Sequence, residues 1–130
     1  MRIIPVKVPK GADPIIYLGN KVRNDGLIGG FILGIGGFDK VKVGVYKGGT
    51  YDITEVCSKN GHVIEVTALL GNYLRVGDNV SIHIHVNLAR SHNEFYGGHL
   101  IEAVVNPFLE VVLIEVGDLS KVFTHRVKTS

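Results

Sequence analysis

The sequence has little of several features that mark particular classes of protein. Cys57 is the only cysteine among 130 residues, which excludes an intrachain disulfide and a cysteine-based zinc site. The 14 basic and 12 acidic residues nearly balance, and the net charge of +2 is too small and scattered for a nucleic-acid footprint. The most hydrophobic stretch, residues 26–37, is too short and too rich in glycine to span a membrane.

The amino terminus has no long apolar core followed by a small-residue cleavage site, so we expect a cytoplasmic protein without a signal peptide. Its length predicts a single domain over residues 1–130. Apolar residues make up 45% and charged residues 20%, as in ordinary globular proteins. The 17 glycines fall largely in pairs and turns, a pattern that favours a sheet with bulges and close strand crossings.

The hydrophobic pattern predicts one helix and many strands. Asp13 can cap a helix that starts at Pro14 and stops at residues 24–26. The expected strands cover residues 2–8, 27–33, 41–45, 51–57, 62–70, 80–88, 96–105, 109–116 and 121–127. Residues 109–114 are apolar on both faces, and one helix cannot cover such a sheet. We therefore expect an α+β fold whose mainly antiparallel sheet is strongly curved on itself, or is covered by a partner subunit.

Histidines carry the most specific chemical signal. Along the strand predicted at residues 80–88, His83 and His85 project to the same face, together with Ser81 and Asn87. The thirteen residues between His85 and His99 fit a hairpin through the polar segment 90–94, which would return His99 beside the pair. Three neutral imidazoles with one open position form a frequent zinc site. The alternative is a pair of half-exposed histidines on a solvated sheet face.

Four phrases, at residues 33–37, 61–66, 83–88 and 97–100, together resemble the Plants and Prokaryotes Conserved (PPC) domain. The resemblance implies a compact α+β domain, a homotrimer, and a metal site on His83, His85 and His99. One departure is His62, which stands where plant members have an arginine. The AT-hook that plant members join to this domain, a short Arg-Gly-Arg-Pro segment, does not occur in the sequence.

These observations lead to a main functional hypothesis and two alternatives. The first is a homotrimeric regulatory or accessory module that binds Zn²⁺ or another divalent transition metal, with Asn87 supporting a ligand and a small anion at the metal. The second is a zinc-dependent enzyme, similar to a hydrolase or to α-acetolactate decarboxylase, that acts on a small carboxylate or carbonyl compound. Glu65 and Glu102 are its candidate acid/base residues, although a solvated strand carboxylate is the default interpretation of both.

The third hypothesis is weak DNA binding through the basic tail. Lys121, Arg126 and Lys128 are the cations that would contact phosphates there. Contacts of this kind carry no sequence information and weaken as salt rises. We therefore expect nucleic-acid binding to be weak or absent.

Overall fold

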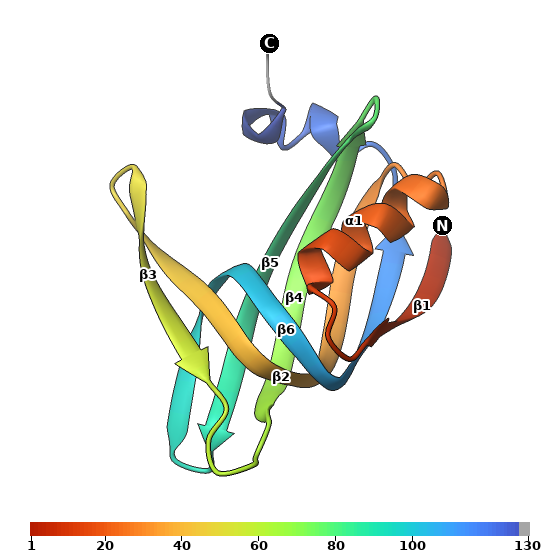
Figure 1. The fold of residues 1–130 in the computed structure, drawn as a ribbon. Coiled ribbons are helices and arrows are strands. Elements are labelled where there is room, and N and C mark those ends of the chain that lie inside the picture. Colours follow the sequence, from red (N-terminus) through yellow and green to blue (C-terminus); the bar gives the residue numbers. More distant parts are fainter. Residues whose placement is uncertain (128–130) are drawn as a thin grey trace.

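The fold consists of six antiparallel strands, one α-helix and two short 3₁₀ helices (Figure 1). A computed structural model describes residues 1–127. The strands are β1 (Arg2–Pro9), β2 (Gly29–Lys47), β3 (Thr50–Cys57), β4 (Ile64–Val76), β5 (Asn79–Ser91) and β6 (Glu94–Glu115). The helices are α1 (Pro14–Asn24), η1 (Leu119–Lys121) and η2 (Thr124–Arg126). The predicted α+β class, with one main helix near the amino terminus, is confirmed.

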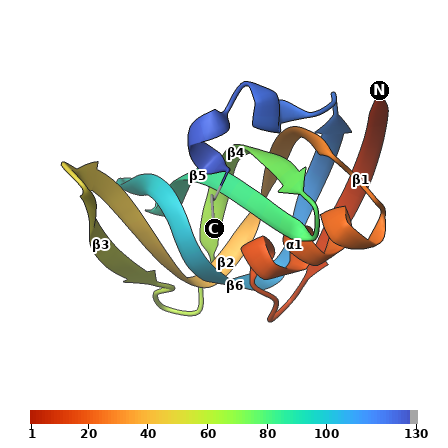
Figure 2. The ribbon, with the colours of Figure 1, turned by 90° about the horizontal axis from the view of Figure 1, so that it is seen from above.

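The sheet curls until it meets itself. Its strand order is β1-β6-β5-β4-β2-β3, and β6 also pairs with β2. Strands β2, β4, β5 and β6 therefore form a closed ring, which is visible when the molecule is seen from above (Figure 2). The ring encloses large, fully buried side chains: Phe38, Ile64, Leu69, Tyr73, Ile84, Leu88, Leu100 and Leu109. Of the two alternatives that the sequence left open, curling of the sheet supplies the core.

Helix α1 begins where the sequence predicts. One carboxylate oxygen of Asp13 accepts hydrogen bonds from the main-chain nitrogens of Ile15 (2.8 Å) and Ile16 (3.1 Å). The other oxygen accepts from the main-chain nitrogen of Ala103 in β6, at 3.0 Å. Leu18 and Val22, four residues apart on the helix, are fully buried in the core. Asp13 thus both starts the helix and ties it to the sheet.

Two predicted strand breaks are wrong. The segments 27–33 and 41–45 belong to one strand, β2, which continues through residues 34–37 with register shifts against β4 and β6. The segments 96–105 and 109–116 are likewise one strand, β6, which continues through Asn106 and Pro107. In both cases the irregular residues form bulges, which bend a strand without ending its pairing. The long, bent strands are what allow the sheet to close.

The strand predicted at residues 121–127 is also wrong, because this segment forms η1 and η2 instead. The Asp118 side chain accepts a hydrogen bond from the Ser120 main-chain nitrogen at 3.0 Å and starts η1. The segment then packs on β4 and β2. Among residues 1–127, no helix is long and apolar enough to cross a membrane.

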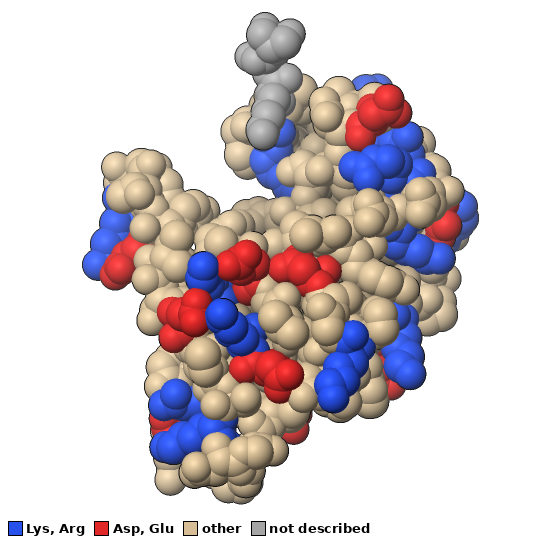
Figure 3. Space-filling view, viewed as in Figure 1, with Lys and Arg blue, Asp and Glu red and all other residues tan. Residues whose placement is uncertain are grey.

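Strand β3 and the second half of β2 form an arm that projects from the ring. Tyr46 pairs with Tyr51 near its tip, where Lys47 and Asp52 form an ion pair of 3.2 Å. A space-filling view shows a hollow between this arm and the carboxyl-terminal segment, and acidic and basic residues that alternate over the visible surface (Figure 3). The absence of a basic stripe on this face agrees with the balanced composition.

Candidate metal centre

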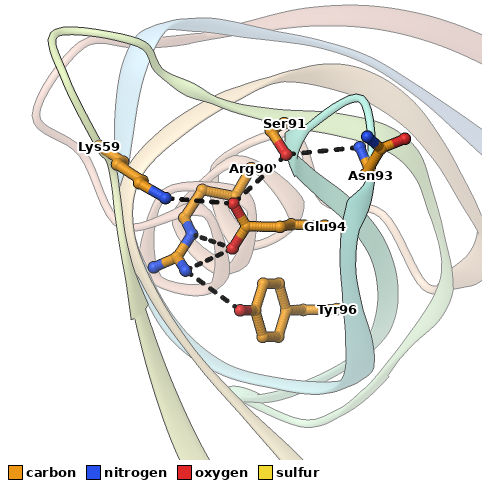
Figure 4. Close-up of polar contacts among 6 residues, drawn as sticks. All are labelled: Lys59, Arg90, Ser91, Asn93, Glu94 and Tyr96. Atoms are coloured by element: carbon orange, nitrogen blue, oxygen red, sulfur yellow. Dashed lines mark hydrogen bonds and ion pairs between the residues drawn. The ribbon is translucent and has the colours of Figure 1, made fainter.

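The β5–β6 hairpin places His85 directly opposite His99. A polar network closes the hairpin at its turn (Figure 4). The Arg90 guanidinium donates to Glu94 at 2.6 Å and to the Tyr96 hydroxyl at 3.3 Å, and Lys59 reaches the same carboxylate at 3.4 Å. This network fixes the register of the two strands, and the register decides which residue faces His85.

The structure brings His83, His85 and His99, here called the histidine cluster, together on the outside of the ring. Each side chain offers a ring nitrogen, and the three nitrogens lie within 4.8 Å of one another. The ring centroids are 5.0, 5.1 and 5.8 Å apart. The intervening Ile84 is buried in the core, as the strand period of two requires. The hairpin return predicted from the sequence is therefore confirmed.

Gly98 lets β6 approach β2 next to His99. Its φ of +148° is rarely adopted by other residues, and a Cβ there would lie 2.6 Å from the main-chain oxygen of Gly44. Any larger residue would push the two strands apart. The glycine before His99 is thus a requirement of the strand crossing that positions this ring.

The histidine cluster favours neutral imidazoles. Desolvation by burial, followed by the nearby His85, lowers the pKa of His99 below its ordinary value. Desolvation also lowers the pKa of His83, with further contributions from His85, His99, Arg126 and His125. The Nδ1 atom of His99 is buried without a hydrogen-bond partner among residues 1–127. An imidazole with an unpartnered ring nitrogen, in a group of three converging imidazoles, fits a metal ligand.

Two neighbours of the histidine cluster have no signal in the sequence. Tyr51, on β3, stacks on His99 with ring centroids 4.8 Å apart and an interplanar angle of 19°. Arg126, on η2, donates hydrogen bonds to Asn72 and Ser81. Asn72 pairs with His83 across the sheet, and Ser81 lies two residues before it. The bent arm and the folded-back tail position these side chains, and neither was predicted.

The other sequence candidates lie outside the histidine cluster. Glu102 extends to Lys42, whose amino group is 2.9 Å away, and this hydrogen bond lowers the pKa of the carboxyl. Glu65 is exposed on β4 and pairs with Ala89 rather than with either histidine of β5. Asn87 is exposed two pairs beyond the His85–His99 pair, opposite Gly97. Neither carboxylate joins the group of converging ligand atoms.

Most of the chain matches a known protein family. The profile of the Plants and Prokaryotes Conserved (PCC, also written PPC) domain matches residues 1–117. The chain belongs to this family. The match spans the whole curled sheet and both histidine phrases, and it ends before η1. The carboxyl-terminal segment that carries Arg126 therefore lies beyond the part shared with the PPC domain profile. No curated protein matches the sequence.

Solved structures share the fold. A metal-containing protein from Archaeoglobus fulgidus is 24% identical, with a TM-score of 0.80 over 91% of this chain and 81% of that one. A PPC protein from Pyrococcus horikoshii is 25% identical, with a TM-score of 0.79 over the same shares. A candidate DNA-binding protein from Bacteroides thetaiotaomicron is 22% identical, with a TM-score of 0.78 over 89% and 79%.

Proposed function

We propose that this PPC-domain protein is a metal-binding homotrimer that acts as a regulatory or accessory module, with His83, His85 and His99 as the ligands. The observation that carries the proposal is the convergence of three ring nitrogens within 4.8 Å. The His99 ring also has an Nδ1 atom that is buried without a hydrogen-bond partner among residues 1–127. A divalent ion with nitrogen ligands, zinc above all, suits three neutral imidazoles at about 2.0–2.1 Å each. The structural similarity to the metal-containing protein from Archaeoglobus fulgidus supports the same assignment.

Three imidazoles leave one coordination position of a tetrahedral ion open. A bound ion would supply a Lewis acid at that position. Catalysis would also require an acid or base within reach of it. Glu102 is held by Lys42, and Glu65 lies outside the cluster, so the described residues favour binding over catalysis.

The outer face of the sheet supports self-association. Phe31, Leu33, Ile35 and Leu70 are 43%, 42%, 53% and 56% exposed, although all are large and apolar. Register places them together, because Leu33 of β2 pairs with Leu70 of β4. Leu70 in turn pairs with His85. A contiguous apolar surface of this kind marks an interaction site, and a three-fold assembly would cover it in every copy.

Metal binding is tested with purified protein and a His85→Ala variant. We expect the wild-type chain to bind about one zinc ion per subunit, by elemental analysis and competition titration. The variant should lose more than about 100-fold in affinity, because even groups that only orient a ligand contribute 10–100-fold. His92→Ala is the matched control, since His92 is exposed in the hairpin turn outside the cluster. Equal zinc affinities of the wild type and His85→Ala would refute the assignment.

A further inference from the structure

Arg126 lies near the histidine cluster, and its positive charge has no acidic partner among residues 1–127. It is half-buried against the outer face, and its hydrogen bonds go to the side chains of Asn72 and Ser81 and to the Ser81 main-chain oxygen. All of these acceptors are neutral. Within residues 1–127, no carboxylate lies within ion-pair distance of this guanidinium. A desolvated cation without a counter-ion is unfavourable unless an anion completes the site.

Arg90, in the same chain, is a guanidinium whose charge is balanced by a carboxylate. It donates two hydrogen bonds to Glu94, at 2.6 and 3.2 Å, in the network of Figure 4. Arg126 has the same chemistry and is also half-buried, but its hydrogen-bond acceptors are neutral groups instead of an acid. Its orientation is nevertheless fixed, because Nε and Nη2 both donate to Ser81, at 3.3 and 3.0 Å. Nη1 has two N–H groups and donates one of them, to Asn72, so a donor remains.

Arg126 is bonded to the residues that flank His83 of the histidine cluster. Asn72 and Ser81 flank His83 on the outer face, the first across the strand pair and the second along β5. On the far side of the cluster, the Tyr51 ring covers His99. A divalent ion on three neutral imidazoles would bring two positive charges, and Arg126 adds a third. The converging group contains no acidic residue that could balance them.

We infer that Arg126 and the open coordination position form one anion site, which takes a small carboxylate. One carboxylate oxygen would occupy the metal's open position, and the anion would be held by the remaining Nη1 donor and the charge of Arg126. A carboxylate matches both partners, because it is a common metal ligand and the best planar acceptor for a guanidinium. The inference rests on the proposed metal site and names the class of its ligand.

The test uses the full chain loaded with Co²⁺, whose visible absorption reports changes in the coordination of the ion. Titration with acetate in chloride-free buffer should change the spectrum of the wild-type protein. In Arg126→Met the acetate affinity should fall about 10- to 100-fold, the usual loss for one charge-assisted hydrogen bond. Lys10→Met removes the same charge from an exposed turn and should bind acetate as the wild type does.

Neutral imidazole is the second probe, because it fills a coordination position without needing a cation nearby. It should bind the wild type and Arg126→Met with affinities within about threefold, which also shows that the variant keeps its histidine cluster. Acetate affinities within twofold of each other, or no response of the cobalt-loaded wild type to acetate, would overturn the anion site alone. A wild-type chain that takes up no cobalt would refute the proposed metal binding, and the anion site with it.

Discussion

Single residues of the histidine cluster were predictable to different degrees. His83 and His85 share a face because side chains alternate along a strand, and a hairpin of ordinary length returns His99 to them. These rules are local, so the sequence contains them. Tyr51 is 48 residues from His99 and stacks on it only because the arm bends back. Arg126 is 43 residues from His83 and reaches the neighbours of His83, Asn72 and Ser81, only through the folded-back tail. No local pattern reports such contacts.

The pKa directions of the cluster predict how metal binding depends on pH. Burial lowers the pKa of His83 and of His99, so both rings are neutral and free to bind a metal at pH 7. Zinc affinity should therefore change little between pH 8 and 7. It should fall steeply below about pH 6, where protons compete for the imidazoles. Calorimetric titrations across this range would measure the effect. An affinity that is unchanged between pH 7.5 and 5 would indicate carboxylate ligands instead.

At the scale of elements, the sequence predicted the kinds of structure better than their limits. The helix followed from its Asp13 cap, which is a local hydrogen-bond pattern. The full lengths of the two long strands could not be predicted in this way. Residues 34–37 and 106–107 resemble the ends of strands when only neighbouring residues are considered. Pairing with two other strands carries β2 and β6 through these points as bulges. Leu119–Lys121 and Thr124–Arg126 form 3₁₀ helices, and the first of them packs on β4 and β2 without pairing as a strand.

Asp13 links the helix to the sheet, and its removal should be costly. Asp13→Ala deprives the helix of its cap, worth about 1 kcal/mol, and leaves the Ala103 N–H without its acceptor, worth about 1–3 kcal/mol more. We expect a loss of about 2–4 kcal/mol in the free energy of unfolding, measured by urea denaturation. Asp13→Asn keeps a capping oxygen and should lose less. Both variants lose the acceptor for the Ala103 N–H, so equal stabilities would mean that the cap at Ile15 and Ile16 contributes nothing.

For the whole molecule, the balanced charge bears on the DNA-binding hypothesis. Arg126, one of the three tail cations considered for phosphate contacts, is half-buried and held by Asn72 and Ser81. Lys128 lies outside the described residues. Lys121 is exposed and does not share the hydrogen bonds that hold Arg126. DNA binding that is weak and lost on raising salt from about 50 to 200 mM therefore stays a prediction. The candidate DNA-binding relative shares the fold, and the fold alone does not carry this function.

Assembly is the property of the whole molecule that the outer apolar face predicts. Leu33→Lys places a charge at the centre of the patch formed with Phe31, Ile35 and Leu70, where burying it without a partner would cost several kcal/mol. Sedimentation at micromolar concentration should show a trimer for the wild type and a folded monomer for this variant. Ile16→Lys is the control, because Ile16 is 67% exposed on α1, away from the outer face. The interface would lie elsewhere if Leu33→Lys stayed trimeric, and a monomeric wild type would contradict the proposed assembly altogether.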